Sequence, residues 1–338
     1  MRVLVFGGTG MLGHRVVYEL AKTETVFAPR RWAGERYTWA FAQATPLAIS
    51  NLTTEEAVRE VFQVARPEVV INCAGVVKGR MQTAGMAQAI LVNSVLPHRL
   101  VSICREWRAR LIHVSTDCVF SGQPRPVHFT GFTGHGADVA EGAAEGALAD
   151  GHLMLAGGYT EVSPPDPSDD YGRSKLLGEV GGPDVLTLRT SFIGRDLGPQ
   201  KTGLLEWLLS RDETPTTPGY VNHVWSGLTS NELARVIARI VKTGRPDFGL
   251  YHVGGQTVTK HDLLVKLAAA YGVATKVLPA DAGVGVSGVN RSLNSKLFWS
   301  ALGGGLTLCA PPLDALIEDL LLDNAPYTPW KKTTGGRS

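Results

Sequence analysis

A tyrosine and a lysine stand four residues apart in the segment Tyr171-Gly-Arg-Ser-Lys175, so a helix would carry both side chains on one face. A free phenol has a pKa of about 10 and is a poor acid–base catalyst at neutral pH. A nearby ammonium favours the phenolate, which brings the pKa toward the working range. Such a tyrosine could donate a proton to a carbonyl oxygen of a substrate. Thr116, at the end of a predicted strand, could hydrogen-bond the same oxygen through its hydroxyl. By itself, the four-residue spacing also suits a tyrosine and a lysine on the exposed face of a helix. It indicates a catalytic pair only in combination with other motifs.

A glycine-rich segment near the start of the chain, Gly7-Gly8-Thr9-Gly10-Met11-Leu12-Gly13, follows an apolar strand and opens a helical pattern. The free N–H groups and the positive dipole end of such a helix bind anions such as a pyrophosphate. Gly7, Gly10 and Gly13 let the backbone approach the phosphates and the helix pack close to the sheet. Alone, the motif could be a plain tight turn. Its place after the first strand of an α/β chain predicts a dinucleotide site. A cationic nicotinamide bound there would favour the Tyr171 phenolate further. Tyr171 would donate its proton to a carbonyl oxygen while hydride arrives at the carbonyl carbon.

The end of the predicted second strand bears on the choice of cofactor. It reads Ala28-Pro29-Arg30-Arg31 and has no acidic residue, which an NAD site usually carries there for the ribose hydroxyls. Two guanidiniums can instead bind a 2′-phosphate. Arg30 and Arg31 therefore favour NADPH and leave NADH as an option, although two solvated surface arginines would look the same in the sequence.

Short β-branched apolar runs alternate with helical patterns through the first half of the chain. This alternation predicts an α/β fold, a Rossmann-type doubly wound parallel sheet with right-handed crossovers. We expect an NADP-binding domain over residues 1–190, a smaller mixed α/β substrate lobe over 191–325 and a flexible tail over 326–338. Residues 226–254 should also pack on the first domain. The predicted strands are 2–6, 25–28, 68–72, 110–115, 185–189 and 249–253, and the main predicted helices are 11–21, 54–65, 87–107, 171–179, 229–241, 260–271 and 313–322.

Residues 123–158 are rich in glycine and alanine and show almost no periodicity. A loop of this length in a compact domain is either functional or disordered. Its composition cannot bury enough apolar area to offset an ordering cost of about 1–2 kcal/mol per residue. We therefore expect a mobile flap beside the catalytic residues, with an ordered lid as the alternative.

Composition narrows the class of protein. Of 338 residues, 44% are apolar and 19% charged, which excludes a chain disordered throughout. The net charge of +2 argues against a general binder of nucleic acid or membrane surfaces. No apolar run approaches the ~18 residues that span a bilayer, and the N-terminus is too glycine-rich for a signal peptide. Four cysteines without CxxC or zinc spacing predict reduced thiols, no metal site and a cytoplasmic location.

Taken together, the motifs resemble the extended short-chain dehydrogenase/reductases, and within them the dTDP-4-dehydrorhamnose reductase family of sugar-nucleotide reductases. The resemblance covers nearly the whole chain and implies reduction of the 4-keto group of an NDP-4-keto-6-deoxy sugar by NADPH. It rests on GGTGMLG (7–13), VVINCAG (69–75), Val92-Asn93, HVSTDCVFSG (113–122), YGRSKLLGE (171–179), LRTSFIG (188–194) and NRSLNSKL (290–297).

The resemblance also assigns roles to individual positions. Thr116, Tyr171 and Lys175 match the family's catalytic residues, and Asn51-Leu52 falls where an acidic residue usually contacts the adenine. With the glycine segment and the arginine pair, the expected cofactor residues are Gly7, Gly10, Met11, Leu12, Gly13, Arg30, Arg31, Asn51, Leu52, Ala74, Gly75, Val76, Tyr171 and Lys175. The expected substrate residues are Thr116, Asp117 and Phe192.

Three departures from the family pattern concern the substrate. Cys118 stands where the family has Tyr, Phe192 where Trp is common, and residues 123–158 replace a connection of a few residues. We therefore expect a different sugar. A non-catalytic subunit resembling the regulatory subunit of methionine adenosyltransferase, and an NDP-sugar epimerase or dehydratase that keeps NAD(H) bound, are the alternatives. A homodimer is left open.

Overall fold

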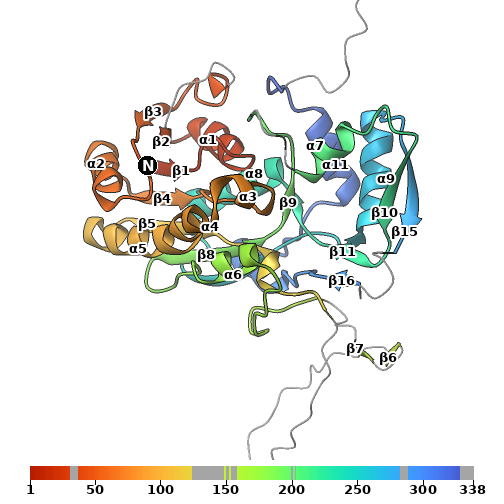
Figure 1. The fold of residues 1–338 in the computed structure, drawn as a ribbon. Coiled ribbons are helices and arrows are strands. Elements are labelled where there is room, and N and C mark those ends of the chain that lie inside the picture. The colour runs from red at the N-terminus through yellow and green to blue at the C-terminus, as the bar shows by residue number, and fades with distance from the viewer. Residues whose placement is uncertain are drawn as a thin grey trace, which may run out of the picture.

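The computed structural model describes residues 1–30, 37–123, 148–149, 152–153, 158–198, 201, 203–281 and 288–327. Seven of its strands form one parallel sheet in the order β13-β8-β5-β4-β1-β2-β3 (Figure 1). The chain runs outward from β1 and then returns to the other side of it, which is the doubly wound arrangement. The predicted fold class is confirmed. The strands are β1 (Arg2–Phe6), β2 (Thr25–Arg30), β3 (Thr45–Ala48), β4 (Val69–Asn72), β5 (Arg110–Val114), β8 (Val185–Thr190) and β13 (Gly249–Val253).

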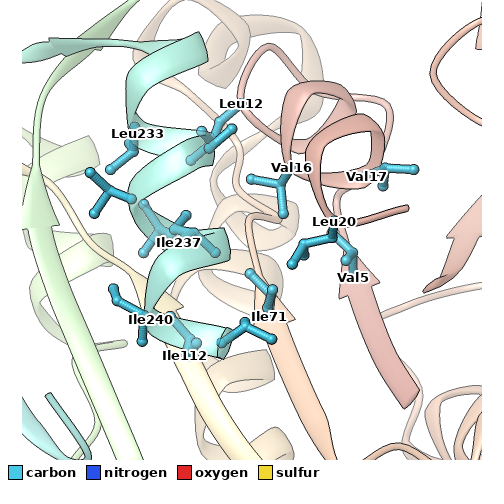
Figure 2. Close-up of a cluster of buried hydrophobic side chains, with 14 of the residues drawn as sticks. Val5, Leu12, Val16, Val17, Leu20, Ile71, Ile112, Leu233, Ile237 and Ile240 are labelled. Atoms are coloured by element: carbon cyan, nitrogen blue, oxygen red, sulfur yellow. The ribbon is translucent and has the colours of Figure 1, made fainter. Parts of the chain in front are cut away.

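Helices cover both faces of this sheet, which explains why its strands are apolar without alternation. In β1, Val3 and Val5 face α1 (Gly13–Ala21) and α8 (Ser230–Thr243), a layer that Figure 2 shows. Leu4 and Phe6 point the other way, into the layer of α2 (Glu55–Ala65) and α5 (Leu96–Trp107). Adjacent residues of one strand thus belong to different cores, as the two-residue strand period requires.

Two elements of the first half of the chain differ clearly from the sequence prediction. The edge strand β3 was not predicted, because its residues Thr45-Pro-Leu-Ala are mostly exposed and include a proline, so the apolar run is missing. The helix predicted over 87–107 is divided into α4 (Met86–Ile90), a π-helical turn (Leu91–Val95) and α5. Pro97 lies at the start of α5 and has no N–H to donate to the preceding turn.

The second lobe lies beside the sheet, to the right in Figure 1, and has its own core of buried side chains around Trp225. Threonine caps begin two of the longer helices: Thr229 accepts from the Glu232 N–H in α8, which packs on the sheet, and Thr259 accepts from the Asp262 N–H in α9. Apart from α8, the described helices after β8 are α7 (Leu204–Leu209), α9 (Lys260–Tyr271), α10 (Lys296–Gly303), which also packs on the sheet, and α11 (Leu313–Leu321). The short strands are β9 (Phe192–Ile193), β10 (Thr216–Tyr220), β11 (His223–Trp225), β12 (Leu228–Thr229), β14 (Val258–Thr259), β15 (Lys276–Ala280) and β16 (Val289–Asn290).

Most of the predicted flap lies outside the described residues; β6 (Leu148–Ala149) and β7 (His152–Leu153) form a short antiparallel pair within it. The predicted tail beyond 327 also lies outside them. Tyr327 itself is not part of a free tail, because its hydroxyl contacts two buried side chains.

Among the described helices, none is long and apolar enough to cross a membrane. The remaining short helices are Lys78–Arg80, α3 (Met81–Ala84), Asp117–Val119 and α6 (Asp170–Leu176).

Candidate active site

A cleft of about 430 Å³ opens at the carboxyl ends of β1, β4, β5 and β8. It lies where the strand order reverses around β1, the usual ligand position in such sheets. A larger cavity of about 760 Å³, lined by 254–256, 293–296 and 305–312 among others, contains none of the predicted site residues. The first cleft is therefore the candidate site. Of the predicted residues it brings together Gly10, Met11, Leu12, Ala74, Gly75, Thr116, Asp117, Tyr171, Lys175 and Phe192.

In the glycine turn (residues 7–13), two glycines cannot be replaced without a clash. A Cβ on Gly7, whose φ is +77°, would come 2.5 Å from the Ala74 nitrogen, and one on Gly13 would come 2.0 Å from the Gly7 carbonyl oxygen. A Cβ on Gly10 would meet only that same oxygen, at 3.3 Å. Gly7 and Gly13 thus shape the turn and do not line the cleft, while Gly10 presents an open backbone to it.

Asn93 connects the segment after β4 to α6, the helix that carries the catalytic candidates Tyr171 and Lys175. Its Oδ1 accepts from the Val76 N–H at 2.8 Å, and its Nδ2 donates to the Val76 carbonyl at 3.0 Å and to Ser174 Oγ at 3.0 Å. Val76 packs on the α2–α5 core and is not part of the cleft wall. Asn93 therefore fixes the backbone beside Gly75 relative to α6, and Val76 contributes through its main chain.

The three catalytic candidates converge because α6 presses on the end of β5. Asp169 caps α6 by accepting from the Gly172 N–H at 2.8 Å. A Cβ on Gly172 would lie 2.2 Å from the Cys118 carbonyl oxygen, so only glycine allows this approach. The Tyr171 hydroxyl shares a hydrogen bond with Thr116, and Lys175 Nζ donates to the Val114 carbonyl at 2.8 Å.

Burial shifts the pKa values of both catalytic candidates away from their charged forms. It lowers the pKa of Lys175 to about 8, against the opposing effects of Glu179 and Cys73. It raises the pKa of Tyr171, and Cys118 adds to that shift while the bond to Thr116 opposes it. The lowering of the Tyr171 pKa by Lys175 predicted from the spacing is not found, because the ammonium is directed to a backbone carbonyl.

Three cations near Asp117 and Asp169 were not predicted from the sequence, and one of them, Lys78, lines the cleft. Arg291 donates from Nε to the Phe120 carbonyl at 2.8 Å and from a terminal nitrogen toward Cys118 Sγ at 3.6 Å. Lys260, at the start of α9, and Arg291 both lower the pKa of Asp117, which burial raises overall. We call Lys78, Lys260 and Arg291 the cation cluster. Arg291 lies in the quoted motif at 290–297, but no spacing signal linked these three residues.

The predicted adenosine-side residues lie apart from the cleft. The Arg30 guanidinium sits 5.1 Å from the centre of the Phe41 ring at the end of β2, and Arg31 lies outside the described residues. Asn51 Oδ1 accepts from the Thr53 N–H and hydroxyl, so it holds the turn before α2, and Leu52 packs partly on the α2–α5 core. Within the described residues, no group of three His, Cys, Asp or Glu side chains could hold a metal ion.

Comparison with known proteins identifies the family. The family described as RmlD substrate binding domain matches residues 1–304. The chain belongs to this family. The resemblance to extended short-chain sugar-nucleotide reductases, inferred from the motifs, is thereby confirmed for this RmlD-type chain.

The relatives of this chain include a methionine adenosyltransferase subunit and sugar-nucleotide reductases. The chain is 24% identical over 346 residues to methionine adenosyltransferase 2 subunit beta of Danio rerio, and the alignment covers 98% of this chain and 94% of that protein. The chain is 26% identical over 258 residues to dTDP-4-keto-6-deoxy-D-glucose reductase of Streptomyces niveus, and the alignment covers 74% of this chain and 72% of that protein. The crystal structure of dTDP-4-dehydrorhamnose reductase from Bacillus anthracis with NADP shares the fold, with a TM-score of 0.67, 19% identity and coverage of 95% and 98%.

Proposed function

We propose that this protein uses NADPH to reduce the 4-keto group of an NDP-4-keto-6-deoxy sugar. The observation that carries the proposal is the meeting of Thr116, Tyr171 and Lys175 in one cleft with the open backbone of Gly10. A proton donor, a cation and an anion-binding turn are the parts that carbonyl reduction by a dinucleotide requires. The names of the Streptomyces and Bacillus relatives support the same reaction class.

The residues present fit a dinucleotide. Gly10 has room on its open side, and the N–H groups at the start of α1 would hold the pyrophosphate, while Ala74 and Gly75 would border the nicotinamide ribose. When bound, NADPH supplies the hydride. Arg30 and Arg31 would bind its 2′-phosphate.

The arginine pair provides a direct test of cofactor choice. Wild-type protein should bind NADPH more tightly than NADH by about 1–3 kcal/mol, the scale of charge-assisted hydrogen bonds. Replacing Arg30 and Arg31 together by Ala should remove most of that difference, as measured by fluorescence titration with both cofactors. Equal affinities in the wild type would contradict this assignment.

In the proposed reaction, Tyr171 is the proton donor. Its raised pKa keeps the phenol protonated at neutral pH, so it can donate to a carbonyl oxygen that Thr116 also contacts. Lys175, buried behind it, is held by the Val114 carbonyl and places positive charge near the developing oxyanion.

The cation cluster suits the diphosphate of a nucleotide sugar. Lys260 and Arg291 come from the substrate lobe, and Lys78 comes from the opposite side, where its Nζ bonds Asp169 at 3.0 Å. Charge-assisted bonds from such groups bind phosphate oxygens strongly. Cys118 and Phe192 line the same cleft and would bound the sugar.

The experiment that tests the proposal is a screen of NADPH oxidation against several NDP-4-keto-6-deoxy sugars that differ in base and in sugar configuration. Wild-type protein should turn over at least one of them, and Tyr171→Phe protein serves as the paired control. If the protein binds NADPH but turns over none of these substrates, the proposed reductase activity is refuted.

A second candidate function is a non-catalytic regulatory subunit. It is favoured by the Danio rerio protein, which aligns with 98% of this chain, whereas the Streptomyces reductase aligns with 74%. This candidate predicts NADPH binding without turnover and a stable complex with a methionine adenosyltransferase catalytic subunit in size-exclusion chromatography. Turnover that depends on Tyr171 would exclude it.

A further inference from the structure

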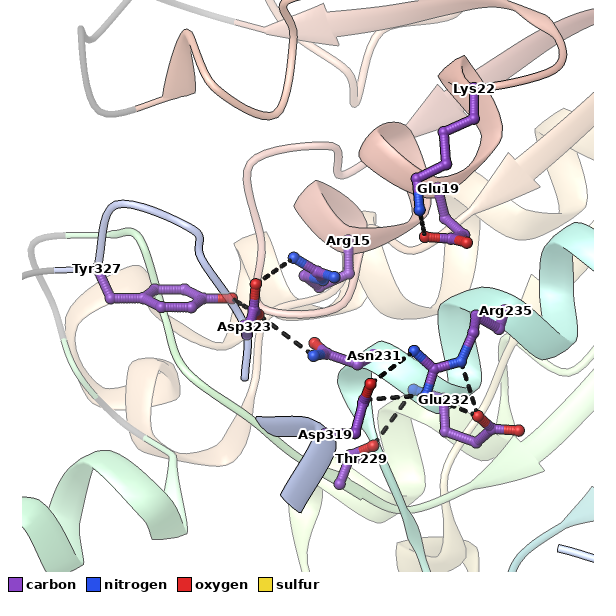
Figure 3. A network of polar contacts seen from close by, with 10 residues as sticks. All are labelled: Arg15, Glu19, Lys22, Thr229, Asn231, Glu232, Arg235, Asp319, Asp323 and Tyr327. Carbon is purple, nitrogen blue, oxygen red and sulfur yellow. Dashed lines mark hydrogen bonds and ion pairs between the residues drawn. The ribbon is translucent and has the colours of Figure 1, made fainter. Parts of the chain in front are cut away.

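The segment that follows α11, residues 323–327, lies against the first helix of the sheet domain; we call it the C-terminal strap (Figure 3). Asp323 accepts from an Arg15 terminal nitrogen at 2.9 Å and from Asn231 Nδ2 at 3.2 Å. The Arg15 and Asp323 side chains are only 7% and 2% exposed, so this ion pair is shielded from water. The strap is therefore anchored to both α1 and α8.

Tyr327 extends this contact to the glycine turn through one histidine. Its hydroxyl lies 3.0 Å from His14 Nε2, and His14 Nδ1 lies 2.9 Å from the Gly10 carbonyl oxygen. The same oxygen accepts the His14 backbone N–H at 3.0 Å. The Tyr327 ring meets the His14 ring edge-on, with the centroids 5.8 Å apart, and the Arg195 guanidinium lies 5.1 Å from its centre.

Hydrogen bonds fix the Tyr327 hydroxyl from the strap side. The hydroxyl donates to Asp323 Oδ2 at 3.0 Å, and its oxygen lies against His14 Nε2. Asp323 is itself held, because it accepts from Arg15, Asn231 and the Ala325 N–H. The hydroxyl and the His14 ring thus connect a fixed carboxylate of the strap to the Gly10 carbonyl.

We propose that Tyr327 and His14 are positioning residues for the dinucleotide pyrophosphate, so that the C-terminal strap completes the cofactor site from the far end of the chain. The inference rests on the proposed function, since it assumes that the glycine turn binds NADPH. Tyr327 fixes the His14 ring, and His14 fixes the Gly10 carbonyl. The direction of the neighbouring N–H groups, which would face the phosphates, follows from that carbonyl.

The test removes one hydroxyl. Tyr327→Phe retains the ring but removes both the contact to His14 Nε2 and the hydrogen bond to Asp323. We expect the Kd for NADPH, from fluorescence titration, to rise about three- to tenfold, the scale of one net hydrogen bond. Amide hydrogen exchange at His14 in the cofactor-free protein should become faster. Turnover at saturating NADPH should stay within about twofold of the wild type, because the hydroxyl touches no reacting atom.

A matched control loosens the same end of the chain without touching α1. Asp319 in α11 accepts two hydrogen bonds from Arg235, and Asp319→Asn weakens that contact alone. It should leave NADPH affinity and His14 exchange unchanged. If Tyr327→Phe behaves like the wild type, or if Asp319→Asn weakens NADPH binding equally, the inference is overturned. Wild-type protein that binds no NADPH would refute the proposed function instead, and exchange at His14 would still test whether the strap holds the turn.

Discussion

Tyr171 and Lys175 illustrate how one cause acts on two neighbouring residues. Burial penalises the charged form of each, so it raises the pKa of the phenol and lowers that of the ammonium to about 8. A protonated phenol is what a carbonyl reduction needs from its acid. The lysine, in contrast, holds its positive charge only up to mildly alkaline pH.

The role of the phenol can be tested by deleting its proton. Tyr171→Phe removes the donor and retains the ring, so NADPH binding should persist while turnover falls by roughly 10²–10⁴, the scale of one positioned acid. Steady-state rates and a fluorescence titration on the same preparation measure both. Near-normal turnover would remove Tyr171 from the mechanism.

The lysine predicts a pH dependence with a definite sign. Its lowered pKa means that the positive charge is present below about pH 8 and is lost above it. If that charge stabilises the oxyanion, kcat/KM should be level at neutral pH and fall above about pH 8. Lys175→Arg, which stays charged, should show no such fall. A wild-type profile that stays flat to pH 9.5 would contradict the prediction.

Among the elements, the site depends on places where a helix touches a backbone directly. α1 meets the glycine turn at Gly13, and α6 meets the short helix Asp117–Val119, which follows β5, at Gly172. Beyond the end of α6, Gly178 lies against the π-helical turn, where a Cβ would come 1.8 Å from the Asn93 carbonyl oxygen. Each approach leaves no room for a side chain, and together they fix the glycine turn, the candidate catalytic pair and the segment after β4 relative to one another.

The first of these contacts supports a stability prediction. Gly13→Ala places a methyl group where the Gly7 carbonyl oxygen lies 2.0 Å away, so the helix or the turn must move. We expect a loss of about 1–3 kcal/mol in the free energy of unfolding, as for other overpacked sites, together with weaker NADPH binding. Urea unfolding measures the first effect.

The chain offers a matched control at Gly181, where an added Cβ meets nothing within 4 Å. Gly181→Ala should change the free energy of unfolding by no more than about 0.5 kcal/mol. Equal effects of the two substitutions would show that crowding at Gly13 is not the cause.

At the scale of the whole molecule, the two ends of the predicted flap meet the same stretch of the substrate lobe. The Gly122 carbonyl accepts from the Asn290 N–H at 2.8 Å, and the Tyr159 N–H donates to the Ser292 carbonyl at 2.8 Å. The flanks of the flap are thus anchored two residues apart in one segment, at β16 and just after it. A short connection can join them without moving the sheet.

Replacing residues 124–157 by a short Gly-Ser connection should therefore leave the melting temperature nearly unchanged, since a long loop adds little closure entropy. NADPH affinity should also be unchanged, while KM for the sugar nucleotide should rise if the flap closes over it. Calorimetry and steady-state kinetics measure these effects. A loss of several kcal/mol would show that the segment packs on the core.

The central strands, and the meeting of the candidate catalytic residues in one cleft, could be predicted because their signals are local: continuous apolar runs, a glycine motif and a four-residue spacing. The involvement of Lys260 and Arg291 could not be predicted, since about 140–175 residues separate them from Asp117, whose pKa they lower. The edge strand β3 carries a proline and little apolar content, so it resembles a loop. The Tyr171 pKa shift depends on burial, which spacing alone does not reveal.

The contact between Arg15 and Asp323 also has a consequence for the order in which the protein is made. The two residues are 308 positions apart, so helix α1 leaves the ribosome long before its buried ion-pair partner exists. At typical elongation rates that interval is about 15–60 s. During it the guanidinium of Arg15 has no carboxylate from Asp323, and the nascent sheet can assemble while its first helix is incompletely covered. Pulse proteolysis of stalled ribosome complexes should show residues near the start of α1 becoming protected only after residue 327 has emerged.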